Sequence, residues 1–141
     1  GTFICMSMDT TRADMTQAVL VGVAFAIRDS FEIAKSLGIH IERTRICGGG
    51  AKSPLWRKII ANVLNIKVDR IASEEGPALG GAMLAAVADG TYASVEEAAA
   101  RIVKVVETVE PDPEIAEKYE TQYRKFVQIY PTVKALFPKL S

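Results

Sequence analysis

The chain has 141 residues, 49% of them hydrophobic and 24% charged, which is typical of a folded globular domain and not of a disordered or fibrous chain. Seventeen basic and seventeen acidic side chains give zero formal net charge, and no long block of like charge suggests a nucleic-acid-binding arm. The longest uncharged apolar run, residues 18–27, is shorter than the ~20 residues of a membrane-spanning helix. We therefore expect neither nucleic acid nor membrane as a partner.

The first segment is predicted to contain a strand and a long helix. Residues 2–6 read TFICM, an apolar run that suits a short buried strand. Thr11 with Asp14 three positions later is the pattern of a capping box, and Gly38 is a candidate C-terminal cap after Leu37. The apolar positions of the helix, three or four apart, predict one buried stripe: Met15, Val19, Val23, Ala26, Ile27, Ile33, Ala34 and Leu37.

Two further strand and helix pairs are predicted next. Residues 42–47 suit a strand that ends in glycines, and Ser53 should cap a helix that starts with Pro54. Residues 66–71 alternate like a strand, and a helix rich in small residues follows over 77–89. This alternation predicts an α/β fold with parallel strands and helical crossovers. The expected buried residues of the middle helix are Leu55, Trp56, Ile59, Ile60, Val63 and Leu64.

The last third is predicted to be mainly helical. Ser94 and Glu97 form a second capping-box pattern, and Asp112 with Pro113 should begin a final helix that Pro131 ends. One face of that final helix carries an apolar and aromatic stripe that should pack on the core: Ile115, Tyr119, Tyr123, Phe126 and Tyr130.

Cysteine and histidine usage predicts no catalytic or metal site. Cys5 and Cys47 both lie in apolar, strand-like contexts, so we expect reduced core residues of a cytoplasmic protein. His40 is the sole histidine and falls on a predicted loop, so we expect a solvated side chain.

The stretch ICGGGAKSPLW, residues 46–56, is the strongest candidate site. It is not a P-loop, because the motif G-x-x-x-x-G-K-S/T would need glycines at positions 46 and 51. It also departs from the dinucleotide-binding pattern G-x-G-x-x-G, because Gly48 and Gly50 match but Ser53 stands at the position of the last glycine. Two interpretations remain: a ligand that approaches the bare backbone of Gly48, Gly49 and Gly50, or a tight turn in which Ser53 is only a helix cap.

Gly80 and Gly81 lie inside a predicted helix, where each costs about 0.5–1 kcal/mol relative to alanine. With Ala78 and Ala82 they form a smooth face. We expect the glycine turn or another helix to pack closely on it.

Three stretches together resemble a known family. MTQAVLVGVAFAIRDS, CGGGAKSPLWRKIIANVL and EEGPALGGAMLA are similar to the C-terminal region of the FGGY carbohydrate kinases, and most to the xylulose kinases. The resemblance implies part of an actin-like ATPase domain of the ribonuclease H-like type over residues 1–91, with a C-terminal helical extension over 92–141. Two positions depart from the family pattern, which has Gly where Cys5 stands and an acidic residue or Gln where Val21 stands.

The resemblance also implies a site. Gly48, Gly49, Gly50 and Ser53 would form the nucleotide-binding turn for the adenosine part of ATP, and Mg²⁺ would be held through the nucleotide. The helix from Pro77 would pack beside this turn. The catalytic aspartate, the phosphate-binding loops and most sugar contacts would lie in sequence before Gly1, so this chain alone should be inactive.

Several alternatives stay open at the sequence level. The sugar could be gluconate, ribulose, fuculose or glycerol instead of xylulose. A few strands leave open sheet edges, which folded proteins usually pair or cover, so the chain is expected to be a fragment, a homo-oligomer or a domain-swapped dimer. The alternative to a kinase is that the chain is a non-catalytic domain that oligomerises.

Overall fold

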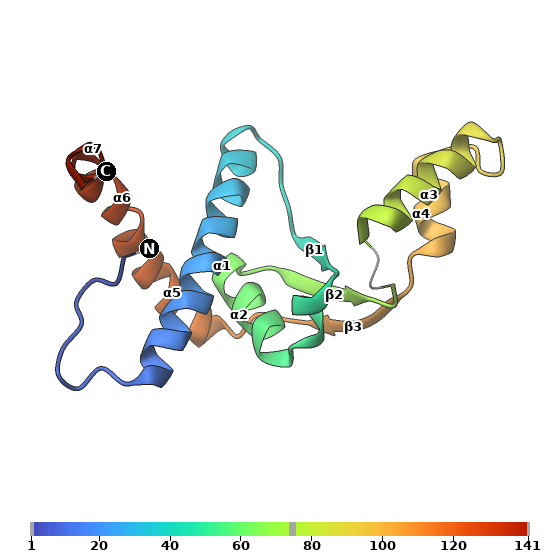
Figure 1. The fold of residues 1–141 in the computed structure, drawn as a ribbon. Coiled ribbons are helices and arrows are strands. Elements are labelled where there is room, and N and C mark those ends of the chain that lie inside the picture. Colours follow the sequence, from blue (N-terminus) through green and yellow to red (C-terminus); the bar gives the residue numbers. More distant parts are fainter. Residues whose placement is uncertain (1, 74–75, 141) are drawn as a thin grey trace.

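The computed structural model describes residues 2–73 and 76–140 and contains a mixed helix and sheet fold (Figure 1). Glu74 and Glu75, which belong to one of the recognised stretches, lie outside the described residues. The elements are α1 Arg12–Ser36, β1 Arg43–Ile46, the 3₁₀ turn η1 Gly49–Lys52, α2 Pro54–Leu64, β2 Lys67–Ile71, α3 Gly76–Ala88, α4 Val95–Ile102, β3 Val105–Val109, α5 Pro113–Phe126, α6 Ile129–Val133, η2 Lys134–Leu136 and α7 Phe137–Leu140.

The sheet has the order β1-β2-β3. β1 and β2 are parallel and α2 is their crossover, which confirms that part of the prediction. β3 pairs antiparallel with β2, a strand that the sequence analysis missed. The division at residue 91 remains a prediction, although β3 brings part of the second segment into the same sheet.

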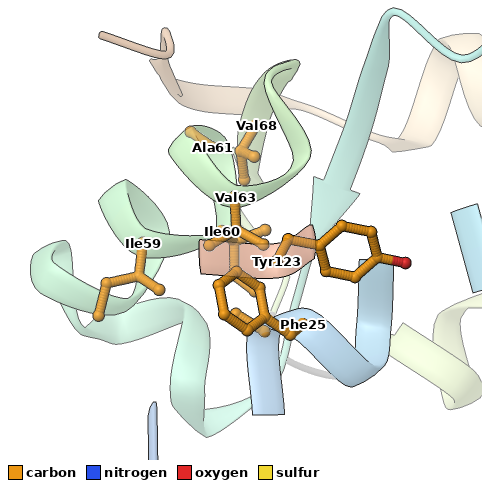
Figure 2. Packing of buried hydrophobic residues seen from close by; sticks show 8 residues of the cluster. Phe25, Ile59, Ile60, Ala61, Val63, Val68 and Tyr123 are labelled. Carbon is orange, nitrogen blue, oxygen red and sulfur yellow. The ribbon is translucent and has the colours of Figure 1, made fainter. Parts of the chain in front are cut away.

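Three helices enclose the core in the middle of the molecule. Phe25 of α1 lies against three aromatic rings of α5, those of Tyr119, Tyr123 and Phe126, with centroid separations of 5.2–6.2 Å. Figure 2 shows Phe25 and Tyr123 converging beside Ile60 of α2. The predicted packing role of these three aromatic residues is confirmed. Figure 1 shows α3 and α4 standing out at one end and α6 and α7 at the other.

The predicted stripe of α1 is wrong in its position. Val19, Val23 and Ile33 expose 53%, 49% and 62% of their surface, whereas Ala24 and Phe25 are buried. The helix is apolar around most of its circumference, so periodicity fits more than one stripe. α2 and α5 pack on only one side of it, and they decide which stripe is buried.

The helix starts agree with the predictions because capping is local. The Thr11 hydroxyl accepts from the Asp14 N–H, and the Asp14 carboxylate accepts from the Thr11 N–H, so the capping box is complete. Ser94 caps α4, but Glu97 accepts from the Ala93 N–H instead of closing the second box. Each serine or threonine oxygen thereby satisfies an N–H that the helix leaves unpaired.

The helix ends agree less well. Gly38 has φ +81°, and the N–H groups of Gly38 and Ile39 reach back to the last turn of α1, the expected glycine-terminated end. Pro131 does not end the final helix. It lies third in α6, within a first turn where a missing N–H costs nothing, and Tyr130 is 59% exposed.

Four burial predictions are wrong. The segment 2–6 forms no strand among the described residues, and Phe3 is 45% exposed because no sheet edge reaches it. Cys5 and Cys47 are free and exposed. Leu55 is 60% exposed, since it sits on the outer side of α2. Cys5 also has φ +64°, a backbone region that favours glycine, which is the residue that the family pattern has there.

Candidate functional site

The glycine turn follows directly from the carboxyl end of β1. Gly48 has φ +81° and ψ −176°, then Gly49–Lys52 forms one 3₁₀ turn, and Ser53 is the N-cap of α2. The N–H of Ala51 donates to the Gly48 carbonyl and that of Ser53 to the Gly50 carbonyl, both at 3.1 Å. The turn is thus a defined structure at the edge where α/β sheets usually bind ligands.

A glycine is accounted for by a different physical reason at each of the three positions. Gly48 adopts a backbone conformation that is essentially restricted to glycine. A Cβ atom on Gly50 would lie 3.2 Å from two atoms of the Trp56 ring, so Gly50 makes room for that ring. A Cβ atom on Gly49 would meet no atom of the described residues within 4 Å. Gly48 and Gly49 both face open space among the described residues, but Gly48 already has a conformational reason to be glycine, so Gly49 is the candidate position for contact with a ligand.

Ser53 has a structural role of its own. Its hydroxyl oxygen accepts from the Trp56 N–H at 3.3 Å, which is the predicted N-cap, and Pro54 is the first helical residue. The hydroxyl proton of a capping serine remains available for donation to another group. A cap and a ligand contact are therefore compatible at this position.

Arg57 lies beneath the turn and is the functional candidate that the sequence analysis missed. It is only 4% exposed. Its Nη1 donates to the Ala51 carbonyl at 2.5 Å, and its Nη2 donates to both carboxylate oxygens of Glu107 at 2.9 Å. A signal was present, because Arg57 is three residues before buried Ile60 and so lies on the apolar face of α2.

Glu107 links the turn to the sheet. It lies on β3 opposite Arg70 of β2, whose Nε approaches it at 3.4 Å. The hydrogen bond from Arg57 is the main reason why the pKa of the Glu107 carboxyl is lowered, and the charge of Arg70 adds to this effect. Glu107 is therefore ionised at neutral pH and holds two arginines.

The first residue of α3 lies close to the start of the glycine turn. A Cβ atom on Gly76 would fall 2.3 Å from the sulfur of Cys47, so the two segments touch where β1 ends. The predicted close packing on the smooth face of α3 is wrong. Cβ atoms on Gly80 and Gly81 would meet nothing within 4 Å among the described residues, so nothing there packs closely on them.

A second concave region lies away from the turn. This groove has a volume of about 970 Å³ and runs between the second half of α1, the loop before β1 and α5. Its lining mixes cationic and anionic side chains, among them Arg28, Lys35, Glu117 and Arg124. His40 lines it too and is exposed. Because neither charge dominates, the groove indicates no ligand class.

Two absences among the described residues bear on function. No helix of residues 2–73 and 76–140 is long and apolar enough to cross a bilayer. Within the same ranges, no group of three or more His, Cys, Asp or Glu side chains is arranged to hold a metal ion.

Comparison with known proteins agrees with the architecture. Residues 1–88 match the C-terminal domain of the FGGY family of carbohydrate kinases. A xylulose kinase of Staphylococcus epidermidis is 35% identical over 96% of this chain and 27% of its own length. A ribulokinase of Mycolicibacterium smegmatis is 32% identical over 92% of this chain and 23% of its own.

The solved structure of a xylulose kinase from Rhodospirillum rubrum has a TM-score of 0.83 and 33% identity, covering 96% of this chain and 28% of that protein. The chain thus spans about a quarter of the length of the relatives it matches. The family match covers well over half of the chain, and the actin-like ATPase fold expected from the sequence is confirmed. The chain belongs to the FGGY family of carbohydrate kinases and corresponds to part of their C-terminal region.

Proposed function

We propose that the complete protein containing this chain is an ATP-dependent sugar kinase that acts on a pentulose, with D-xylulose as the first candidate. The chain contributes the adenosine end of the ATP site through Gly48, Gly49, Gly50 and Ser53. The observation that carries this proposal is the open space at Gly49, at the carboxyl end of β1 and beside α3. No atom of the described residues lies within 4 Å of the Cβ position there, so a ligand can approach bare backbone at this point.

The chain's own contribution to catalysis is binding and orientation. Bound ATP supplies the phosphoryl group, and phosphoryl transfer depends mainly on positioning and charge neutralisation. The described residues offer no acidic cluster for a metal ion, so Mg²⁺ would be held through the nucleotide. The base that accepts the proton of the sugar hydroxyl would come from sequence outside this chain. We therefore expect no kinase activity from residues 1–141 alone. Because the proposed reaction consumes ATP, we also expect the complete protein to be cytoplasmic.

The sugar is a separate part of the proposal. Xylulose is favoured by the run AKSPLW and by the similarity to a xylulose kinase, while the ribulokinase relative keeps ribulose open. Gluconate, fuculose and glycerol remain the other candidates. A coupled assay of the complete protein with these five substrates and ATP tests this part, and the highest kcat/KM identifies the acceptor.

The nucleotide site is tested with Gly49→Val. Isothermal titration of the complete protein with ADP should show binding for the parent protein and at least tenfold weaker binding for the variant. Gly22→Val is the matched control, because Gly22 also has open space around its Cβ position and no positive φ but lies on α1. Equal affinity in the parent and Gly49→Val proteins would contradict the assignment of Gly49. A parent protein that binds no ADP would contradict the nucleotide site altogether.

A non-catalytic oligomerising domain is the second candidate function. Its support is the exposed apolar stripe of α1, which includes Val19, Val23 and Ile33. The aromatic face of α5 is largely occupied by the core, so it offers less surface for a partner. We propose that this chain by itself self-associates through α1 or a sheet edge, as a homo-oligomer or domain-swapped dimer. Oligomers without any ADP binding would favour this second function.

A further inference from the structure

We propose that Arg57 is a positioning residue that, together with Glu107, holds the glycine turn in the shape that receives the nucleotide. This inference rests on the proposed function, because it names the support of that same site. Nothing in the glycine motif itself indicates such a support. The support comes from a buried cation on α2 and a carboxylate fifty residues further along the chain.

Arg57 contacts the turn through its side chain. Its guanidinium donates to the Ala51 carbonyl inside η1, whereas its backbone N–H makes the ordinary first helical bond of α2, to the Ser53 carbonyl at 3.2 Å, which any residue at this position would make. Ala51 is only 5% exposed, so the middle of the turn is held on its inner side. The inner side of the turn is thereby fixed while Gly49, on the outer side, stays open.

Glu107 fixes the guanidinium in turn. Nη2 of Arg57 reaches both carboxylate oxygens, and Arg70 on the neighbouring strand approaches one of them. Because Glu107 lies in the middle of β3, the turn is tied to the sheet and not only to its own helix. A planar guanidinium can serve a carbonyl and a carboxylate at once, whereas the single ammonium of lysine cannot reproduce that fork.

This support matters for binding because the turn presents backbone and not side chains. If the ligand contacts backbone at Gly49, its affinity depends directly on where the main chain lies, and displacements of about 1 Å can cost large factors in binding or rate. In metal sites, outer groups that orient a ligating residue change affinity or activity by about 10–100-fold when removed, which sets the scale for such support. The expected effect of losing Arg57 is in that range.

A merely stabilising arginine would behave differently, and Arg28 provides the matched control. Arg28 is also largely buried, pairs with Glu32 and Glu120 and donates to the Val63 carbonyl. It lies between α1 and α5, where it has no contact with the turn. Arg57→Met and Arg28→Met therefore both remove a buried cation, but only the first releases the turn.

The experiment measures turn protection and nucleotide binding in the complete protein. Hydrogen exchange should speed up at the Ala51 and Ser53 amides in Arg57→Met but not in Arg28→Met. ADP affinity should fall at least tenfold in Arg57→Met, fall less in Glu107→Gln, and stay within twofold in Arg28→Met. With ATP as the varied substrate, Arg57→Lys should raise KM more than it lowers kcat, because lysine keeps the charge but loses the fork.

The other outcomes of these measurements would each contradict a specific part of the proposal. Unchanged exchange at Ala51 and Ser53 in Arg57→Met would overturn the positioning role. Faster exchange with unchanged ADP affinity would overturn its link to the nucleotide. A parent protein without ADP affinity would overturn the proposed function and with it that link, while the exchange data still decide whether Arg57 shapes the turn. If Arg57→Met does not fold, Arg57→Lys and Glu107→Gln carry the same comparison.

Discussion

The three consecutive glycines allow one prediction that separates folding from binding. Each is replaced singly by alanine, which adds one Cβ atom and changes little else. Gly48 has a backbone conformation reserved for glycine, Gly49 faces open space, and Gly50 lies against Trp56. The same chemical change should therefore have three different effects on the free energy of unfolding.

The magnitudes follow from each site. Non-glycine residues at the φ and ψ of Gly48 cost about 1–3 kcal/mol, of which about 0.4–1 kcal/mol is offset because alanine restricts the unfolded chain. Gly50→Ala moves the Trp56 ring by a few tenths of an ångström, and an off-rotamer ring costs about 0.5–1.5 kcal/mol. Gly49→Ala meets no described atom and should be neutral or stabilising by up to about 1 kcal/mol.

Urea unfolding followed by circular dichroism measures these differences, provided that the transition is two-state and its slope is unchanged. The expected order of stability is Gly49→Ala first, then Gly50→Ala, then Gly48→Ala. ADP titration should give a different order, because Gly49→Ala combines the highest stability with a clear loss of affinity. A Gly49→Ala protein that is both less stable and normal in ADP binding would refute the reasoning.

Three further predictions concern stability and association. The pKa of Tyr123 is raised to about 12, mainly by burial, so Tyr123 ionises in the unfolded chain before it does in the folded protein, and stability should fall as pH rises from about 10 to 12. The urea midpoint of Tyr123→Phe should lack that part of the fall, and parallel pH profiles of the two proteins would contradict the prediction. Asp112→Ala removes a cap that accepts from the Glu114 and Ile115 N–H groups and should cost about 1 kcal/mol in the same assay, whereas an unchanged midpoint would show that the cap is dispensable. Val23→Glu, at a position 49% exposed, should reduce self-association of this chain in sedimentation velocity without lowering stability, and unchanged sedimentation would locate the contact elsewhere.

Local features of the fold could be predicted from sequence because their causes are local. The caps at Thr11, Ser53 and Asp112 involve hydrogen bonds that span two or three residues, and all three form as expected. Gly38 and Gly90 have positive φ where the helices before them end. The crossover from β1 to β2 likewise follows from short periodic segments.

Features set by distant partners could not be predicted in this way. Which side of α1 is buried depends on α2 and α5, and the sequence of α1 is apolar enough to accept either side. β3 consists of VVETV, whose β-branched residues suited a strand, but its pairing with β2 is established by contacts about forty residues apart. The predicted burial of Cys5 and Cys47 was wrong for the same reason, because an apolar segment is buried only where another element covers it.

The candidate site combines both situations. Its position in the chain was predictable, because a glycine run after a strand can only be a bare turn. The separate roles of the three glycines were not predictable, because these identical residues differ only through the positive φ of Gly48 and the ring of Trp56 beside Gly50, while Gly49 has neither. Arg57 completes this picture, since a buried arginine in the apolar register of α2 needs a hydrogen-bonding partner. That partner is Glu107 on β3, so the strand that the sequence analysis missed is also the one that supports the turn.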